Sequence, residues 1–348
     1  MHNPTTKQPN NKTMKAVILP AYNQNVLRAM LSLKVEEIPI PIPQKDEVLI
    51  KIEATPCNPS DIAFLQGGYN IVKTLPSVPG FEGAGTVVST GDSAKAKKLF
   101  KKKVSCFTQE DSHGIWAEYF VTKTNNCIPV DEKMEIEQVA CFAINPFTAY
   151  GLYETARKNI SPAIILNAAA GQVARFVQVL AKANNINVIN IVRKKEQIDE
   201  LIELGEKYVL NSNDDDFEKD LKETAHLLYA TTAFDAVGGD LSGKILNSMP
   251  PKSEIIVYGG LSAKPISKVG VLDIIFKNKI ISGFNLNQWI ETKINIGEFQ
   301  RISEELQQMI IKGEMKTVIQ KTYKFDNVIK GMRQYLSNMS GGKILFVP

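Results

Sequence analysis

The chain has 348 residues, 44% of them hydrophobic and 22% charged, so it is long enough for about two globular domains. Its 41 Lys and Arg against 37 Asp and Glu give a formal charge of +4, an excess too small for a dedicated nucleic-acid-binding domain. No apolar run reaches the roughly 20 residues that a membrane-spanning helix needs, which argues against a membrane protein.

Residues 1–13 are polar and contain two prolines. They lack the apolar stretch of a secretory signal and the Arg-rich pattern of a transit peptide, so we predict a disordered tail and a cytoplasmic protein. The four cysteines, Cys57, Cys106, Cys127 and Cys141, form no CxxC pair and are expected to be reduced thiols.

Residues 14–138 have the pattern of a mostly β domain. In the segment 47–54, Val48, Ile50 and Ile52 alternate with residues that face the other way, as in a half-buried strand. Further strands are predicted at 15–19, 85–89, 103–107 and 117–121.

From residue 139 the pattern changes to strands that alternate with helices. Strands are predicted at 163–166, 187–192, 208–211, 234–237, 254–260 and 280–284, with helices near 173–180 and 195–204, the latter ending at Gly205. This alternation indicates a parallel sheet covered on both faces. After 289, an amphipathic helix at 298–312 and a strand at 343–347 follow. We therefore predict a catalytic domain at 14–138 and 289–348, interrupted by a nucleotide-binding domain at 139–288.

A nucleotide site is predicted where the first strand of this insertion meets its helix. The small residues at 168–171 would let a pyrophosphate approach the backbone at the helix N-terminus. The predicted contacts are Ala169, Ala170, Gly171, Gln172 and Val173. Gln172 and Ala174 stand where glycines are usual, so a tight turn without a ligand is the alternative.

The residues after the next strand indicate which nucleotide is bound. Sites for NAD usually carry Asp or Glu there, whereas this chain has Arg193, Lys194 and Lys195. These cations would pair with a 2′-phosphate, which favours NADPH. A solvated basic helix start is the alternative.

Several segments together resemble the medium-chain dehydrogenase/reductases, in the branch of quinone oxidoreductases and 2-enoyl thioester reductases. They are NPSDIAFLQGGY at 58–69, LPSVPGFEGAGTV at 75–87, AINPFTAY at 143–150, YGGLS at 258–262 and IFKNKIISGFNLNQW at 275–289. The resemblance implies a GroES-like, mostly β catalytic domain, an inserted Rossmann domain with a doubly wound parallel sheet, an active site between the two, and a homodimer.

The same resemblance indicates a protein without catalytic zinc. Zinc-dependent relatives need a Cys and a His as ligands, and this chain has Asn58 and Phe81 at those places, with Glu82 retained. We therefore expect an NADPH-dependent reductase that transfers hydride to an activated C=C bond, as in a 2-enoyl thioester or an enone, or to a quinone.

Tyr69 and Asn58 are the predicted catalytic residues. Tyr69 matches the tyrosine that donates to the enolate in enoyl thioester reductases, and its alternative is an aromatic plug in the loop. Asn58 is predicted to hydrogen-bond the nicotinamide or substrate, whereas Asp61 is expected to bond the loop backbone.

Further cofactor contacts are predicted on the resemblance, each with a structural alternative. Thr148 would contact the nicotinamide or a phosphate, or else pack behind Pro146; Lys343 would contact the cofactor, or else be a solvated lysine. The glycine-rich turn Tyr258, Gly259, Gly260 and Leu261 would let the backbone approach the cofactor, or else be a loop after a buried strand. Phe284 and Leu286 would line the nicotinamide pocket, or else belong to the core.

Three remaining features bear on substrate and partners. Asn285 replaces an aromatic residue and predicts a more polar substrate pocket, while Trp289 is expected to pack at the domain junction. The lysine-rich segment Lys95–Lys103 is expected to be a solvated loop, with attraction of an acidic partner as the sharper alternative. A non-catalytic NADPH-binding or RNA-binding relative is the alternative function, although no aromatic RNA-binding motif is present.

Overall fold

The computed structural model describes residues 12–110 and 113–348, which fall into two compact units. The first unit holds the chain up to Ala143 together with Ile319–Asn338 and Lys343–Pro348, and the second holds Ile144–Val318 and Met339–Gly342. Most of the predicted disordered tail lies outside the described residues. Its last residue, Thr13, already begins strand β1.

The first unit is built mainly of strands. Its elements are β1 (Thr13–Ile18), α1 (Val26–Leu31), β2 (Lys34–Pro39), β3 (Glu47–Pro56), α2 (Pro59–Leu65), β4 (Glu82–Thr90), α3 (Ala94–Leu99), β5 (Lys103–Phe107), β6 (Tyr119–Lys123), β7 (Cys127–Pro129), α4 (Ile136–Ala140), β14 (Ile319–Lys324), α13 (Val328–Ser337) and β15 (Lys343–Val347).

These strands form a pair and a larger mixed sheet. β1 pairs with β2, and the described strands of the larger sheet run in the order β14-β15-β3-β4-β5-β7, with β6 also pairing with β3. The predicted alternation in β3 is confirmed, since Val48, Ile50 and Ile52 are all buried in one core cluster. β15, from the end of the chain, pairs antiparallel with the end of β3, Leu345 opposite Pro56.

The second unit alternates helices and strands as predicted. Its elements are α5 (Asn145–Lys158), β8 (Ala163–Asn167), α6 (Gln172–Ala183), β9 (Asn187–Val192), α7 (Lys195–Glu203), β10 (Tyr208–Asn211), α8 (Phe217–Leu227), β11 (Ala230–Asp235), α9 (Asp240–Ser248), β12 (Glu254–Val257), α10 (Val271–Lys277), β13 (Ile280–Gly283), α11 (Leu286–Asn295) and α12 (Phe299–Ile311).

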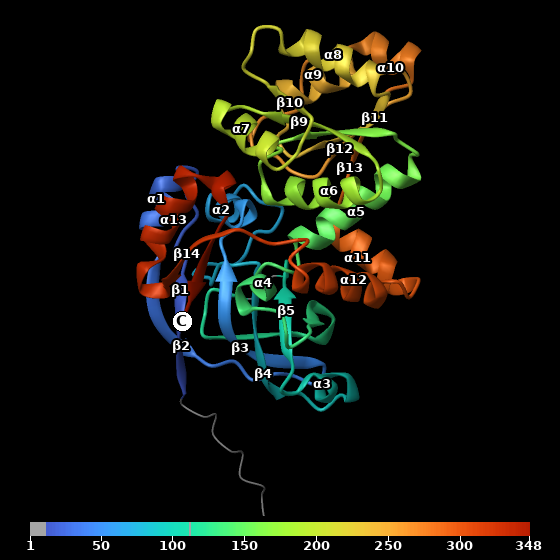
Figure 1. Cartoon of the computed structure of the whole chain (residues 1–348). Helices are drawn as coiled ribbons and strands as arrows, with labels where there is room; N and C mark the ends of the chain where they lie inside the picture. Colours follow the sequence, from blue (N-terminus) through green and yellow to red (C-terminus); the bar gives the residue numbers. More distant parts are fainter. Residues whose placement is uncertain (1–11, 111–112) are drawn as a thin grey trace, which may run out of the picture. The chain divides into compact units, whose positions relative to one another are not determined.

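Its six strands form one parallel sheet in the order β10-β9-β8-β11-β12-β13. Numbered along the unit, this is the order 3-2-1-4-5-6 of a Rossmann sheet. Helices α8 and α9 lie on one side of the sheet and α5 and α6 on the other (Figure 1). The predicted doubly wound parallel sheet and the predicted mostly β first unit are thus confirmed.

Some local predictions differ from the structure. The predicted strand 254–260 ends at Val257, because Tyr258 and Gly259 turn to donate their N–H groups to the Asp235 carbonyl. The lysine-rich segment is not simply a loop, since Ser93 caps helix α3, which buries Ala96 and Leu99 under its lysines. The helix predicted to stop at Gly205 does so, and Gly205 has a φ of +88° that favours glycine.

The contacts divide the chain later than the predicted boundary at 289. Segment 289–318, predicted to belong to the catalytic domain, groups with the second unit. The reason is its packing on α5: Phe299 of α12 stacks on Phe147 with ring centroids 5.1 Å apart, and Trp289 of α11 bonds Glu154.

Candidate functional site

The strand order of the second unit reverses between β8 and β11. In open parallel sheets, ligands bind outside the carboxyl ends of the strands at such a reversal. Asn167 ends β8 and Asp235 ends β11, and the Asn167 side-chain amide donates to the Asp235 carboxylate at 2.5 Å. The two strands adjoining the reversal are therefore joined by a buried polar contact.

Asp235 also organises the loop that follows β11. Its carboxylate accepts hydrogen bonds from the backbone N–H groups of Val237 and Gly238, at 2.8 and 2.9 Å, and from the Ser242 hydroxyl. Three backbone and side-chain donors beside the Asn167 amide satisfy this buried carboxylate without a cation. These hydrogen bonds tie the ends of β8 and β11 and the loop after β11 to one carboxylate.

The β8–α6 turn has the small residues predicted for a phosphate site. Ala169 and Ala170 are buried, and Ala168 takes a left-handed φ of +48° that turns the chain into the helix. Gly171 caps α6, whose first-turn N–H groups have no partner within the helix. This leaves a helix N-terminus without bulky side chains, which suits an anionic group.

Gln172 has a second use for its side chain. Its amide oxygen accepts from the Val318 N–H at 3.1 Å and its amide nitrogen donates to the Lys316 carbonyl at 3.3 Å. The predicted nucleotide contact of Gln172 therefore falls to its backbone N–H, like that of Val173. The Gln172 side chain thus fastens the segment 316–318 to the start of α6.

Arg193 and Lys194 lie directly after β9, and both side chains are exposed. Among the described residues neither cation takes part in an ion pair or side-chain hydrogen bond, although the Arg193 carbonyl accepts from Asn213 at 2.8 Å. No carboxylate follows β9 before Glu196 in α7. Two exposed cations at this edge are compatible with the predicted 2′-phosphate contact.

The turn Tyr258–Leu261 lies at the same edge, after β12. A Cβ at Gly259 would be 2.9 Å from the Ala236 carbonyl oxygen, so this position requires glycine for the two loops to pack. Gly260 is open, with nothing within 4 Å of an added Cβ, and Leu261 is 51% exposed. Burial, followed by the charge of Asp235, raises the pKa of Tyr258 and keeps the phenol neutral.

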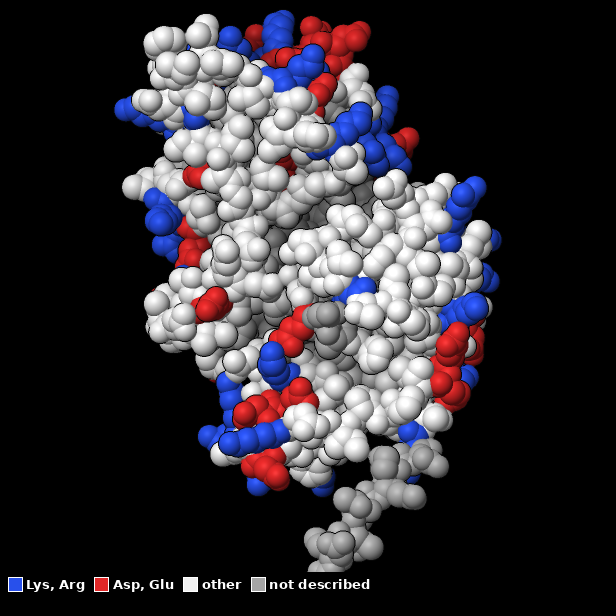
Figure 2. All heavy atoms as spheres, turned by 180° about the vertical axis from the view of Figure 1, so that it is seen from behind, with Lys and Arg blue, Asp and Glu red and all other residues white. Residues whose placement is uncertain are grey.

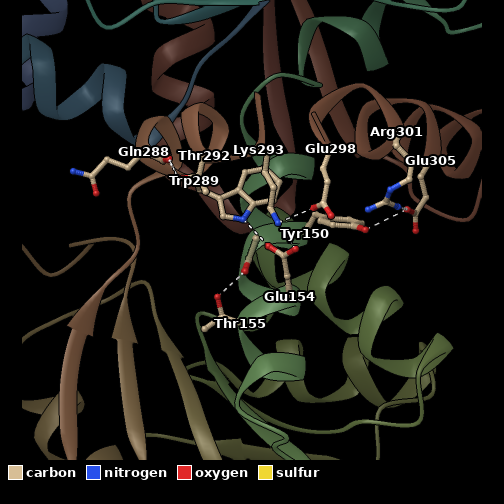
Figure 3. Close-up of polar contacts among 11 residues, drawn as sticks. Tyr150, Glu154, Thr155, Gln288, Trp289, Thr292, Lys293, Glu298, Arg301 and Glu305 are labelled. Carbon is tan, nitrogen blue, oxygen red and sulfur yellow. Dashed lines mark hydrogen bonds and ion pairs between the residues drawn. The ribbon is translucent and has the colours of Figure 1, made fainter. Parts of the chain in front are cut away.

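Phe284 and Leu286 flank the start of α11, next to the carboxyl end of β13. The Asn285 side chain accepts from the Gln288 N–H at 3.1 Å and thereby caps this helix, which gives a structural reason for the residue. Phe284 packs on Gly151 of α5, one turn after the buried Thr148. Trp289, expected at a domain junction, bonds Glu154 of α5 within the second unit (Figure 3).

In the first unit, two predicted residues far apart in sequence meet. Asn58 and Lys343 are 3% and 5% exposed, and the Lys343 ammonium donates to the Asn58 amide oxygen. The antiparallel register of β15 and β3 explains this, because it brings the start of β15 opposite the residues just after β3. The alternative of a solvated Lys343 is therefore wrong.

The other half of the Asn58 amide contacts Glu82. Its nitrogen donates to the buried Glu82 carboxylate at 3.0 Å, so Lys343, Asn58 and Glu82 form one chain of hydrogen bonds. Phe81, the preceding residue, is buried with its ring 5.3 Å from Phe64 and 5.2 Å from Tyr69. The two positions discussed for zinc ligands thus hold an engaged amide and a packed ring.

Asp61 has the structural role predicted for it. Its carboxylate accepts the backbone N–H groups of Asn58 at 2.7 Å and Phe81 at 3.1 Å. Complete burial raises the pKa of Asp61 to about 7, while these two hydrogen bonds and the Lys343 charge act in the opposite direction. Asp61 therefore fixes the loop that carries Asn58.

Tyr69 is half-buried and has a partner that the sequence did not suggest. The Gln109 amide nitrogen donates to the Tyr69 hydroxyl oxygen at 2.8 Å. Burial raises the pKa of Tyr69, as does the Asp61 charge, whereas the Gln109 hydrogen bond lowers it. A phenol that accepts from an amide keeps its own proton available for another acceptor.

The structure brings the predicted residues together in two sets, one in each unit. In the first unit Asn58 and Lys343 touch, and Tyr69 is linked to them through Phe81 and Asp61. In the second unit the predicted nucleotide residues that follow β8, β9, β12 and β13 share the carboxyl edge of the sheet, whereas Thr148 lies on α5. Sequence reasoning missed Gln109, Asp235 and Glu154. Only Asp235 had a local signal, since an acidic residue ends a buried strand before two glycines.

Charge is mixed over the surface. On the face shown in Figure 2, cationic and anionic side chains adjoin each other and large areas are uncharged. The lysines of α3 are mostly exposed, and Lys103 pairs with Glu132 at 3.6 Å. Attraction of an acidic partner by this segment stays a prediction.

Within residues 12–110 and 113–348, no helix is both long and apolar enough to cross a membrane. In the same residues, His, Cys, Asp and Glu side chains do not gather in a group of three or more that could hold a metal ion. All four cysteines are buried and unpaired.

Both units match described families. Residues 44–132 match the Alcohol dehydrogenase GroES-like domain, and residues 173–307 match the family described as Zinc-binding dehydrogenase. The mitochondrial enoyl-[acyl-carrier-protein] reductase of Rattus norvegicus is 29% identical over 278 residues, covering 77% of this chain and 72% of that protein. That of Dictyostelium discoideum is 28% identical over 90% of each chain.

Solved structures agree with these matches. A candidate NADPH:quinone reductase from Mesorhizobium loti is 32% identical, with a TM-score of 0.89 over 98% of this chain and 100% of its own. A mutant enoyl thioester reductase from Candida tropicalis, 21% identical, shares the fold with a TM-score of 0.78 over 97% of this chain and 100% of its own. Because a relative 32% identical covers 98% of it, the chain belongs to the medium-chain dehydrogenase/reductase superfamily, in its quinone oxidoreductase and enoyl reductase branch.

Proposed function

We propose that this protein is an NADPH-dependent, zinc-independent reductase of activated C=C bonds, with quinones as the second substrate class. The observation that carries the proposal is the Tyr69 hydroxyl, which accepts a hydrogen bond from Gln109 and so keeps its proton for a substrate. Relatives named enoyl-[acyl-carrier-protein] reductase support the first substrate class, and the relative named as a candidate NADPH:quinone reductase supports the second.

The second unit has residues that fit NADPH. The bare N-terminus of α6 and the open turn at Gly260 suit a pyrophosphate, and the unpaired Arg193 and Lys194 suit a 2′-phosphate. When bound, NADPH supplies the hydride. The chain's own residues bind and orient it through Ala169, Ala170, Gly171, Gln172 and Val173 at the turn, and through Thr148, Tyr258, Gly259, Leu261, Phe284 and Leu286 along the same edge.

In the first unit, the proposed task is to stabilise charge on the substrate. Hydride addition to the β-carbon of an enoyl thioester or enone places negative charge on the carbonyl oxygen. Tyr69 would donate a hydrogen bond to that oxygen or pass its proton to the α-carbon. The buried Lys343 ammonium would hold the Asn58 amide in one orientation, with its nitrogen on Glu82.

Zinc independence is supported by charge as well as by residue type. A divalent cation near Asn58 would lie close to the Lys343 ammonium, and the two positive charges would repel each other. Among the three positions discussed for zinc ligands, Glu82 supplies a carboxylate, and it already accepts a hydrogen bond from Asn58. A phenylalanine at position 81 offers no ligand atom.

A homodimer is the proposed assembly, formed through the edge of the second unit. β13 is the edge strand of its sheet, and α10 beside it buries none of its residues. Apolar residues that are each 54–76% exposed lie there: Val271, Leu272, Ile275, Phe276 and Ile280. A second copy could pair with β13 about a twofold axis and cover this surface.

The dimer is tested by sedimentation of a charge variant. Phe276→Glu should convert a dimer to monomers, whereas Ile160→Glu, a change at another exposed apolar residue, should not. A wild-type monomer would refute the assembly and leave the proposed reaction untouched.

The proposed compartment is the cytoplasm, supported by the four unpaired cysteines; cell fractionation is the test.

The reaction is tested by following NADPH oxidation with crotonyl thioester, an enone and a quinone side by side. Turnover of at least one substrate with NADPH, and slower turnover with NADH, is the expected result. The ranking of the three substrates identifies the class. Cofactor binding without any turnover would instead support the non-catalytic alternative, and failure to bind NADPH would refute both.

A further inference from the structure

Helix α5 has a recess at Gly151 that the Phe284 ring fills. A Cβ added at Gly151 would lie 2.5 and 2.6 Å from two carbons of that ring and 3.2 Å from the Trp289 indole. Real Cβ atoms do not approach so closely, so any side chain here would displace Phe284. The ring position thus depends on the absence of a side chain at residue 151.

A polar cluster fastens α11 to α5 one turn further along. Trp289 donates its indole N–H to one Glu154 oxygen at 2.9 Å, and the Lys293 ammonium contacts the other at 2.5 Å (Figure 3). Lys293 also bonds Glu298 at 3.1 Å and is 7% exposed. A buried ammonium needs such compensation, so the cluster specifies one seating of α11.

We call the Gly151 recess and the cluster of Glu154, Trp289 and Lys293 the clamp. It holds the segment that leads from the carboxyl end of β13 into α11. Phe284 continues from β13, and its N–H donates to the Val257 carbonyl at 2.9 Å. Thr148 lies three residues before Gly151 and so on the same face of α5. Gly151, Glu154 and Lys293 lie behind Phe284, on the side of α5 and α11, and they include none of the residues assigned to nucleotide contact.

We propose that Gly151 and the Glu154–Lys293–Trp289 cluster are positioning elements that fix the Phe284 ring against the nicotinamide half of NADPH. This rests on the proposed function, because it presumes a nucleotide at this sheet edge. The adenosine half, assigned to Arg193 and Lys194, is held at β9 by other elements. The clamp should therefore affect the contribution of the nicotinamide half to NADPH affinity and leave that of the adenosine half unchanged.

The test compares affinities for NADPH and for adenosine 2′,5′-bisphosphate, which lacks the nicotinamide half, by calorimetry. Gly151→Ala should weaken NADPH about tenfold, the effect of a crowded side chain, and leave the bisphosphate unchanged. The control is Gly331→Ala in α13, where an added Cβ would also lie 2.5 Å from a phenylalanine ring, that of Phe346. It should reduce thermal stability similarly and change neither affinity.

A milder variant covers the case in which Gly151→Ala does not fold. Glu154→Gln keeps the shape but removes the charge that Lys293 needs, and it should shift the affinity ratio in the same direction by about threefold. Arg301→Gln breaks an exposed ion pair with Glu305, 3.0 Å long and also drawn in Figure 3, and should leave the ratio unchanged.

The outcomes separate the two proposals. If wild-type protein binds neither compound, the proposed function fails. If the wild-type protein binds both compounds, two results refute the positioning role: the variants lower both affinities equally, or they lower neither affinity. In both cases the Gly151 recess and the Glu154–Lys293–Trp289 cluster serve stability alone.

Discussion

The candidate site residues fall into two sets, one in each unit, and the two sets are made of different chemical groups. In the second unit, the nucleotide edge consists of backbone N–H groups, small side chains and two exposed cations after β9. In the first unit, a buried ammonium, an amide and a buried carboxylate form a chain of hydrogen bonds, and the buried Asp61 carboxylate bonds the backbone of Asn58. A site made of backbone tolerates side-chain changes, whereas buried charge does not. Substitutions of these residues should therefore lower the stability of the folded protein most in the first unit.

Lys343→Met should give the largest loss of stability. It leaves Asn58 without its donor and the buried Asp61 and Glu82 without a compensating cation, which typically costs about 3–5 kcal/mol. Urea unfolding measures it, with Lys324→Met, at an exposed lysine of β14, as the control. An equal and small change in both variants would mean that the buried cluster is no more sensitive than the surface.

The same variant has a signature in pH. Lys343 lowers the pKa of Asp61, which burial nevertheless raises to about 7, so without the cation this pKa rises further. Above it, the folded state must bury an uncompensated carboxylate that the unfolded state exposes to water. The loss should therefore be larger at about pH 8.5 than at about pH 5.5; an equal loss would place the cost elsewhere.

Tyr69→Phe should lower kcat by about 10²–10³ with enoyl thioesters, since one donor to the developing charge is lost. NADPH affinity should change little, because the interaction belongs to the transition state. A quinone, which can take protons from solvent, should be affected less. Full activity of the variant on every C=C substrate would mean that Tyr69 only packs.

Gln109→Met sharpens this prediction, because Gln109 donates to the Tyr69 hydroxyl. Its effect on kcat should be smaller than that of Tyr69→Phe, and it should vanish in the Tyr69→Phe background, as expected for residues that act through one contact. Steady-state kinetics of the four proteins of this cycle provide the measurement. Additive losses would separate the two residues.

The two sets of residues also differ in how well the sequence predicted them. The nucleotide edge follows the chain, since strand, turn, helix and strand are contiguous over 163–192, and periodicity and small residues identify each element. The Lys343–Asn58 contact spans 285 residues, and only the pairing of β15 with β3 creates it. No local pattern could have indicated it, and the same holds for Gln109 and Tyr69, 40 residues apart.

The sequence also could not predict the hydrogen-bond partners of two side chains near the carboxyl edge of the parallel sheet. Gln172 looked like a defect in a glycine pattern, yet its side chain binds the backbone at Lys316 and Val318. Asn285 looked like the loss of an aromatic residue and is the cap of α11. Both substitutions have a local structural reason that appears only once the partner segments are placed.

Arg193→Ala should have a moderate effect, confined to the affinity of the second unit for its nucleotide. Affinity for NADPH should fall about ten- to a hundredfold, and affinity for NADH should hold, because only NADPH has a 2′-phosphate. Lys219→Ala, at an exposed lysine of α8, controls for net charge. Equal losses for both cofactors would refute the 2′-phosphate assignment.

Removal of metal should have the smallest effect, which is none. Purified protein should contain substoichiometric zinc, and treatment with a chelator should leave kcat with NADPH unchanged. The reason lies in the first unit: Asn58 is engaged by Lys343 and Glu82, and Phe81 is packed against Phe64 and Tyr69. A zinc ion would have to displace the Lys343 ammonium, repel it, or bind through Glu82 alone, and none of these gives the three protein ligands of a catalytic site. Added zinc should likewise leave the melting temperature unchanged, since an ion that binds only the folded state would raise it. Stoichiometric zinc whose removal abolishes turnover would show that the buried ammonium and a metal coexist, and the contrast between the two units would then be wrong.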